Sequence, residues 1–126
     1  MFEVKVIGTG RYVPENIVTN DDLSKIVDTN NEWIKSRTGI RERRISKEEN
    51  TSELAAKAGR KALESSKLKP EDIELIIVST ATPDNFTPST ACMVQEKLGA
   101  INATCFDISA ACTGFIYAVG IASQFI

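Results

Sequence analysis

The end of the chain carries the feature that most restricts the fold, a long run without a charged residue. No Asp, Glu, Lys or Arg occurs from Ile108 to Ile126. The residues leading into this run, Ala103 to Ile108, predict a short buried strand. From Thr113 onward the run is apolar and rich in small residues, which predicts a helix covered on all sides. Polar residues such as Ser109 and Gln124 interrupt the run and no basic flank follows, so we do not expect a membrane span.

Cys112 lies at the expected junction of this strand and this helix. The first turn of a helix has unpaired N–H groups and a partial positive charge, which favour a thiolate over a thiol. Small neighbours such as Ala111 and Gly114 leave room for a substrate to approach. Cys112 is therefore a candidate nucleophile, although a free Cys among Ala and Phe is more often a small core residue. Cys92, inside an expected helix, and Cys105, in mid-strand, are weaker candidates because neither lies at a helix start.

Strands and helices are expected to alternate along the rest of the chain. An apolar run within Ile73–Thr80 predicts a strand covered on both faces. The sequence Asn50-Thr51-Ser52-Glu53 predicts the capping box of a helix that reaches Ser66. The other expected strands are Phe2–Gly10 and Ile40–Ile45, and the other expected helices are Asn20–Val27, Glu32–Ser36 and Ser89–Leu98. This alternation predicts an α/β layered domain with a mainly parallel sheet.

Composition bounds the classes of function. With 126 residues, of which 42% are hydrophobic and 25% charged, the chain can form one small globular domain. The net charge of −2 gives no reason to expect nucleic acid or an anionic membrane as a partner. Three Cys without paired spacing predict neither a disulfide framework nor a zinc site, so no metal is expected. A reducing, cytoplasmic setting is the simplest interpretation.

Two further observations concern the ends of the chain and its lack of His. Met1–Gly8 alternates like a first strand and lacks a long apolar core, so no signal peptide is expected. Ser123–Ile126 contains no Gly, Lys or Pro that would stop a helix, so we expect the front part of a longer polypeptide. A Cys nucleophile usually needs a second group for proton handling or charge stabilisation. The chain contains no His, so this group cannot be a His within these residues.

Separate stretches of the sequence resemble one family, β-ketoacyl-acyl-carrier-protein synthase III, which starts bacterial fatty-acid synthesis. Ala110-Ala111-Cys112-Thr113-Gly114-Phe115 is similar to its nucleophile motif, and Val27–Arg44 is similar to its coenzyme A-binding segment. Similarity continues through Ile7–Pro14 and Ala81–Ser89, so it runs along the whole chain in the family's order. The resemblance implies a thiolase-like α/β fold built from two similar halves. Residues 1–126 would form the incomplete first half, the amino-terminal part of a condensing-enzyme domain whose second half is absent from this chain.

The resemblance also implies the chemistry. Cys112 would take the acyl group from acetyl-CoA or another short acyl-CoA. Decarboxylative condensation with malonyl-acyl carrier protein would then give a β-ketoacyl-acyl carrier protein. The acyl-CoA is a substrate, and no separate cofactor is implied. The family's His and Asn partners would lie downstream, so residues 1–126 alone are not expected to complete the condensation.

The resemblance assigns substrate-binding roles to four other residues. Trp33 would stack on the adenine of coenzyme A, Thr29 would hydrogen-bond nearby, and Arg37 would contact the nucleotide end. Phe86 would lie in a loop that reaches across a homodimer interface and helps to close the partner's acyl pocket. An exposed indole or an always-charged guanidinium suits such stacking and phosphate contacts.

Plainer alternatives remain open for these residues and for the function. Trp33 could anchor a short helix, Phe86 could be buried under a neighbouring loop, and the arginines within Arg41–Arg44 favour a solvated face. Asp107 receives no role. A related thiolase-superfamily condensing enzyme with another acyl-CoA starter fits the same motifs. A non-catalytic acyl-CoA-binding subunit of the same fold is a further alternative, against which the intact Cys112 argues.

Overall fold

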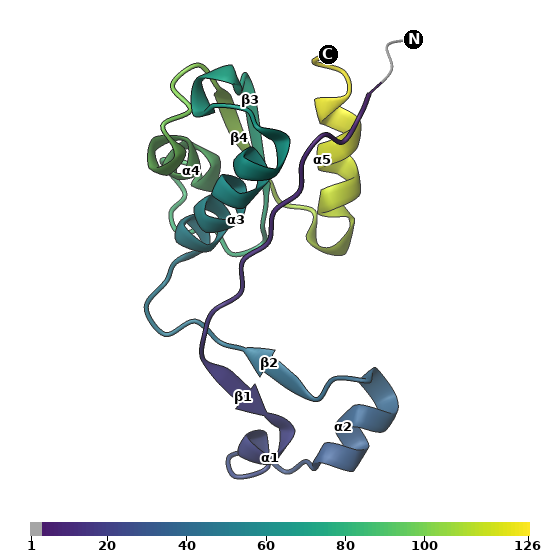
Figure 1. Ribbon diagram of the computed structural model, residues 1–126. Coiled ribbons are helices and arrows are strands. Elements are labelled where there is room, and N and C mark those ends of the chain that lie inside the picture. Colours follow the sequence, from purple (N-terminus) through teal and green to yellow (C-terminus); the bar gives the residue numbers. More distant parts are fainter. Residues whose placement is uncertain (1–3) are drawn as a thin grey trace. The chain divides into compact units, whose positions relative to one another are not determined.

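The computed structural model describes residues 4–126, which form two compact units (Figure 1). The larger unit joins the amino-terminal segment up to Tyr12 to Asn50–Ile126, and the smaller unit is Val13–Glu49. Each unit has its own two-stranded sheet.

The larger unit is built on a parallel pair of strands, β3 (Leu75–Ser79) and β4 (Thr104–Ile108). The register runs from Leu75 opposite Thr104 to Ser79 opposite Ile108. A parallel pair needs a crossover, and helix α4 (Thr90–Leu98) provides it. Helix α5 (Gly114–Ala122) lies on the opposite side of the strands from α4 (Figure 1). This layering confirms the predicted α/β class with a parallel sheet.

The core of the larger unit lies where α4 packs against helix α3 (Thr51–Ser66) and the sheet. Its fully buried apolar side chains are small, which lets the helices approach closely: Ala56, Ala91, Val94 and Ala100. The predicted capping box is present, because Glu53 Oε2 accepts the N–H of Asn50 at 3.0 Å. Both helices therefore begin and end close to where the sequence predicts.

The expected strand at Phe2–Gly10 is wrong over its described residues. Residues 4–10 form no strand, and residues 2 and 3 lie outside the described part. Within residues 4–126, β3 and β4 pair only with each other. Gly8 and Gly10 instead press against α3: a Cβ on Gly8 would lie 2.7 Å from the carbonyl oxygen of Ala62. Close packing on a helix thus replaces strand pairing here.

The sequence predicted that the last helix is covered on all sides. Within residues 4–126, helix α5 is not covered in this way. Only Gly114 of this helix is buried, whereas Phe115 and Ile116 are 71% and 68% exposed. One side of α5 contacts β3 and β4, and no described residue covers the other side. The short turn η2 (Ala111–Thr113) leads into α5, and a second short turn, η1 (Pro70–Asp72), precedes β3. No helix within residues 4–126 has both the length and the hydrophobicity that crossing a membrane requires.

The smaller unit contains two short antiparallel strands and two helices. Strand β1 (Ile17–Thr19) pairs with β2 (Glu42–Arg44), with Val18 opposite Arg43. Helices α1 (Asn20–Leu23) and α2 (Asn31–Thr38) connect them. The sequence did not predict β1. It also predicted a helix over Asn20–Val27, whereas α1 ends at Leu23. Thr19 caps α1 by accepting the N–H of Asp22 at 3.1 Å.

Candidate active site

Cys112 lies in the η2 turn between β4 and α5 and is exposed. The turn is closed by Thr113, whose N–H and hydroxyl donate to the carbonyl oxygen of Ala110 at 3.1 and 2.8 Å. Ala111, directly before the thiol, has φ of 42°, a left-handed conformation that non-glycine residues rarely adopt. Such strain costs about 1–3 kcal/mol and persists only where the surroundings impose it. The surroundings of this turn therefore determine where the thiol sits.

Strand β3 meets both ends of this turn. Before the turn, the N–H of Thr80 donates to the carbonyl oxygen of Ile108 at 3.1 Å, which continues the pairing of the two strands. After the turn, Gly114 lies against Ser79, and a Cβ at Gly114 would overlap Ser79 Oγ. The sequence suggested that Gly114 leaves room for a substrate. That interpretation is wrong, because Ser79 fills this space.

Asp107 holds the strand that leads to Cys112. Its two carboxylate oxygens accept the backbone N–H groups of Thr90 and Ala91, each at 2.7 Å. Thr90 and Ala91 are fully buried in the first turn of α4, where N–H groups have no partner within the helix. A carboxylate there also interacts favourably with the helix dipole. No role was predicted for Asp107 from the sequence. A lone charge on an otherwise apolar strand was the signal that could have revealed this one.

A second carboxylate, Asp84, caps α3 in the same way. It accepts the N–H groups of Thr51 and Ser52 at 2.7 and 2.9 Å. Burial works to raise the pKa of Asp84, but hydrogen bonds from Ser52 and Thr51 outweigh it, and the pKa is lowered. Asp84 lies in the loop between β3 and α4, which the Ser89 cap of α4 closes at its far end. The loop is thus held at both ends.

Phe86 lies in this loop, two residues after Asp84, and its side chain is 101% exposed. Burial under a neighbouring loop, the plainer expectation from sequence, is therefore wrong for the described residues. A fully exposed phenyl ring gains nothing from burial within this chain, so the structure leaves it available for contacts with another surface.

The other two cysteines differ from Cys112. Cys105 on β4 is half-buried, and burial raises the pKa of its thiol, with a further contribution from the neighbouring Cys92. A raised pKa keeps a thiol protonated and poorly nucleophilic. Cys92 lies inside α4, where its backbone N–H donates to the hydroxyl oxygen of Ser89. The Ser89 hydroxyl in turn donates to the sulfur of Cys92. These environments support the prediction that Cys92 and Cys105 are weaker candidates for the nucleophile than Cys112.

The expected coenzyme A-binding residues belong to the smaller unit. Trp33 and Arg37 are one turn apart on α2, and Arg37 Cζ lies 5.1 Å from the centroid of the indole ring. This distance is that of a cation–π contact. Trp33 remains 55% exposed, so it does not serve to anchor its helix in a core. Asn30 caps the helix by accepting the N–H of Trp33 at 2.8 Å, and the half-buried Thr29 directly precedes it.

Asn20 organises the base of α2 and was missed by the sequence analysis. It is 1% exposed and donates to Asn31 Oδ1 at 2.9 Å and to the carbonyl oxygen of Ile40 at 2.8 Å. Its own oxygen accepts Arg43 Nη2 at 2.7 Å. Arg43 also donates to the carbonyl oxygen of Val18 at 3.2 Å, so its assignment to a solvated face is wrong. These bonds join both ends of α2 to the sheet of the smaller unit.

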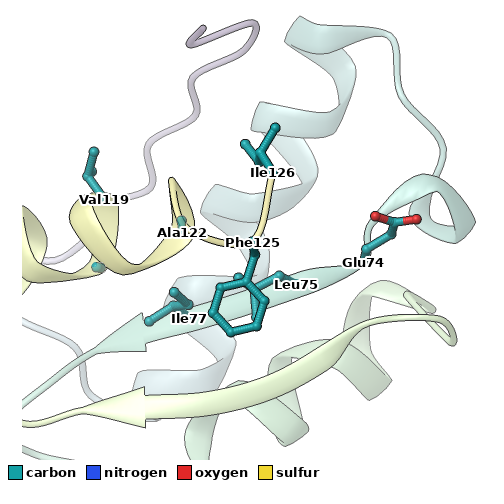
Figure 2. Close-up of a pocket in the computed structure, with 8 residues that line it drawn as sticks. Glu74, Leu75, Ile77, Val119, Ala122, Phe125 and Ile126 are labelled. Atoms are coloured by element: carbon teal, nitrogen blue, oxygen red, sulfur yellow. The ribbon is translucent and has the colours of Figure 1, made fainter. Parts of the chain in front are cut away.

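A cavity of about 480 Å³ lies between β3 and the end of α5, away from the predicted residues. Figure 2 shows the ring of Phe125 beside Leu75 and Ile77 of β3. The cavity is also lined by Glu74 and by four small or aliphatic residues: Ala118, Val119, Ala122 and Ile126. It contains no nucleophile, so Cys112 defines the candidate site better than this cavity does. Within residues 4–126, no three His, Cys, Asp or Glu side chains cluster as metal ligands would.

The structure places the predicted residues in two groups. Cys112 and Phe86 belong to the larger unit, whereas Thr29, Trp33 and Arg37 belong to the smaller one. Within the smaller unit, Trp33 and Arg37 are brought into contact. Asp107, which lies on the strand that leads to Cys112, has its hydrogen-bond partners Thr90 and Ala91 in an earlier part of the sequence.

Comparison with known proteins supports the resemblance along the whole chain. β-Ketoacyl-[acyl-carrier-protein] synthase III of Clostridium acetobutylicum is 68% identical over 126 residues, which cover 100% of this chain and 39% of that protein. The same enzyme of Clostridium novyi is 64% identical over the same span. The chain therefore spans about two fifths of the length of the curated relatives it matches. No family model matches the chain.

Solved structures confirm the fold. The crystal structure of 3-oxoacyl-[acyl-carrier-protein] synthase III from Aquifex aeolicus VF5 superposes with a TM-score of 0.93 and 56% identity. It covers 96% of this chain, which matches 39% of that one. The priming β-ketosynthase of the R1128 polyketide pathway superposes with a TM-score of 0.92 and 41% identity over 95% of this chain and 36% of its own. The thiolase-like α/β class and the resemblance to β-ketoacyl-acyl-carrier-protein synthase III are thus confirmed.

Proposed function

We propose that this chain is the amino-terminal part of a condensing enzyme of the β-ketoacyl-acyl-carrier-protein synthase III type. Residues 1–126 would contribute the nucleophile and the nucleotide-binding segment to one catalytic domain. The observation that carries the proposal is Cys112, exposed in a strained turn at the start of α5. All 126 residues of this chain align with a named synthase III at 68% identity and cover 39% of that protein.

In the first stage, Cys112 takes the acyl group of acetyl-CoA or another short acyl-CoA. The thiolate sulfur attacks the thioester carbonyl, a new C–S bond forms, and the C–S bond to coenzyme A breaks with release of its thiolate. The position of Cys112 supports this step, because the start of α5 supplies N–H groups and a partial positive charge near the thiol. The acyl-CoA is consumed as a substrate, and the scheme needs no further cofactor.

Coenzyme A binding is assigned to Thr29, Trp33 and Arg37. Arg37 lies over one face of the Trp33 indole, and the exposed remainder of the ring is the surface on which adenine would stack. Stacking of a base on an aromatic side chain contributes about 1–3 kcal/mol. Asn20 supports this assignment indirectly, because it fixes both ends of the helix that carries the two side chains.

In the second stage, malonyl-acyl carrier protein loses carbon dioxide. The resulting carbanion attacks the acyl-Cys carbonyl, a C–C bond forms, and the Cys112 sulfur leaves. Decarboxylation and the charge that develops require hydrogen-bond donors. The chain contains no His, so the His–Asn pair that the family resemblance implies cannot be completed within it. We therefore infer that residues 1–126 alone do not catalyse the condensation.

We also propose that the whole enzyme acts as a homodimer in which Phe86 contacts the partner's acyl pocket.

A coupled assay tests this proposal. The polypeptide expressed through its natural stop codon is mixed with acetyl-CoA and malonyl-acyl carrier protein, and the acyl carrier protein product is followed by mass spectrometry. Formation of acetoacetyl-acyl carrier protein that the Cys112→Ala variant does not form would support it. Condensation that survives Cys112→Ala, or no product from the intact polypeptide, would contradict it.

A second candidate is a priming ketosynthase with a different acyl-CoA starter. The observation that favours it is the similarity to the R1128 priming β-ketosynthase at 41% identity. The two candidates share Cys112 and differ in acyl chain. Competition between acetyl-CoA and longer or branched acyl-CoAs for the same thiol distinguishes them.

A further inference from the structure

We propose that Ser79 is a positioning residue for Cys112 and acts through its contact with Gly114. The importance of this contact for catalysis rests on the proposed role of Cys112 as nucleophile. Ser79 is the last residue of β3, and Gly114 is the first residue of α5. Ser79 is far from Cys112 in sequence and belongs to none of the motifs that point to function.

In the side-chain conformation that Ser79 adopts, the contact leaves no space for a side chain at Gly114. A Cβ there would overlap Ser79 Oγ, lie 3.3 Å from Ser79 Cβ, and lie 3.9 Å from Ala110 Cβ. Gly114 is also the one buried residue of α5. Ser79 therefore sets how closely the first turn of α5 approaches the end of β3.

The thiol lies in the segment that this contact controls. Cys112 precedes Gly114 by two residues, in a short turn that continues directly into α5. The other end of the segment is tied to the same strand, because Ile108 pairs with Ser79 and its carbonyl oxygen accepts the N–H of Thr80. The path from Ile108 to Gly114 thus starts and ends at one strand end. A shift of Gly114 cannot be absorbed without moving the turn that holds the thiol.

Helix propensity alone and the contact with Ser79 predict opposite effects for the substitution Gly114→Ala. Replacing Gly by Ala inside a helix normally stabilises it by about 1 kcal/mol. If Ser79 did not matter, Gly114→Ala would leave the thiol in place and strengthen α5. The structure predicts instead that Gly114→Ala pushes the start of α5 away from β3. A displacement of about 1 Å at a reacting group can lower a rate by a factor of about 100.

Four variants of the polypeptide expressed through its natural stop codon test the inference. They are Gly114→Ala, Ser79→Ala, the double variant, and Gly120→Ala as a matched control. Gly120 lies on the same helix, and a Cβ there has nothing within 4 Å. The measurement is the rate of Cys112 acetylation as a function of acetyl-CoA concentration. It gives a maximal rate and a half-saturating concentration.

We expect Gly114→Ala to lower the maximal rate about 10- to 100-fold and to leave the half-saturating concentration unchanged, because coenzyme A binding is untouched. Ser79→Ala should lower the maximal rate by more than about twofold but by less than Gly114→Ala does, because the start of α5 then loses the hydroxyl against which it packs. Gly120→Ala should stay within about twofold of the unmodified protein. The double variant should recover most of the loss, since the overlapping Oγ is gone and only a tight 3.3 Å contact between Cβ atoms remains. A Gly114→Ala variant with a normal maximal rate, or a double variant without recovery, would overturn the inference.

Alkylation separates this inference from the proposed function. The rate at which iodoacetamide labels Cys112 is measured by peptide mapping in the same variants, with Cys92 and Cys105 as internal references. If Gly114→Ala lowers the alkylation rate of Cys112 and the double variant restores it, the result supports the positioning role, whether or not the unmodified protein is acetylated. A lack of acetylation in the unmodified protein would count against the proposed function alone. Equal Cys112 alkylation in all four variants would contradict the positioning role.

Discussion

Asp107 Oδ2 accepts the backbone N–H of Thr90 at 2.7 Å, and this bond joins the strand that leads to Cys112 to the first turn of α4. The loop that carries Phe86 ends at the same helix start. One carboxylate therefore orders the approach to the candidate nucleophile and one end of the Phe86 loop. Asp84 fixes the loop again at the start of α3.

Replacing Asp107 by Asn should destabilise the larger unit by about 1–3 kcal/mol, because one of two buried N–H groups loses its charged acceptor. The measurement is the free energy of unfolding in urea. Glu96→Gln is the matched control, since it makes the same change on an exposed side chain of α4. Equal stability of the two variants would show that the contact at Thr90 contributes nothing.

The lowered pKa of Asp84 predicts how stability depends on pH. A carboxyl group whose pKa is lower in the folded state stabilises the fold above its unfolded pKa, which is about 4. This contribution is lost as the pH falls through the lower, folded pKa. Asp84→Asn should therefore weaken the loss of stability below about pH 4, whereas Glu64→Gln, an exposed change on α3, should not. Parallel stability curves for Asp84→Asn and the unmodified protein between about pH 2 and 5 would contradict this.

Trp33→Ala should weaken coenzyme A binding about 5- to 100-fold, the loss expected when a stacked ring is removed. Trp33→Phe keeps a planar ring and should lose less. Isothermal titration with coenzyme A measures both affinities. Because Trp33 is 55% exposed, neither variant should unfold the smaller unit. Unchanged affinity in Trp33→Ala would remove this residue from the proposed binding segment.

Phe86→Ala should leave the free energy of unfolding of the chain within about 0.5 kcal/mol of the original, because the ring is 101% exposed. It should change acyl-CoA selectivity or self-association if Phe86 contacts a partner's pocket. Competition between short and longer acyl-CoAs and sedimentation velocity measure these properties. A variant with the original selectivity and the original association would leave Phe86 without the proposed role.

Local sequence signals predicted helices α3 and α4 and the two parallel strands well. The capping box at Asn50, the Ser89 cap and the glycine at position 99 each act within a few residues, and α3 and α4 follow them. Local signals failed where distant parts of the chain decide the outcome. Residues 4–10 alternate like a strand, yet in the larger unit Gly8 packs against α3 and no described strand pairs with the segment.

The residues of the candidate site also fall into those that local motifs predicted and those that depend on contacts between distant parts of the chain. Cys112 and Trp33 were predicted because each lies in a recognisable motif. Ser79, Asp107 and Asn20 were not, because their partners lie far away in sequence and only folding brings them together. A single sequence carries no record of such contacts. Asp107 came nearest to being predictable, as a lone charge on an apolar strand.

The most direct test of the central claim is the intact mass and peptide map of the protein after exposure to acetyl-CoA. Two samples are compared, the 126-residue chain and the polypeptide expressed through its natural stop codon, each with its Cys112→Ala variant. We expect one acetyl group on Cys112 in the polypeptide expressed through its stop codon, and none on Cys92, on Cys105 or in the Cys112→Ala variant. If the polypeptide expressed through its natural stop codon still binds coenzyme A but carries no acetyl group on Cys112, this result would contradict the proposed role of Cys112 and favour a non-catalytic acyl-CoA-binding subunit.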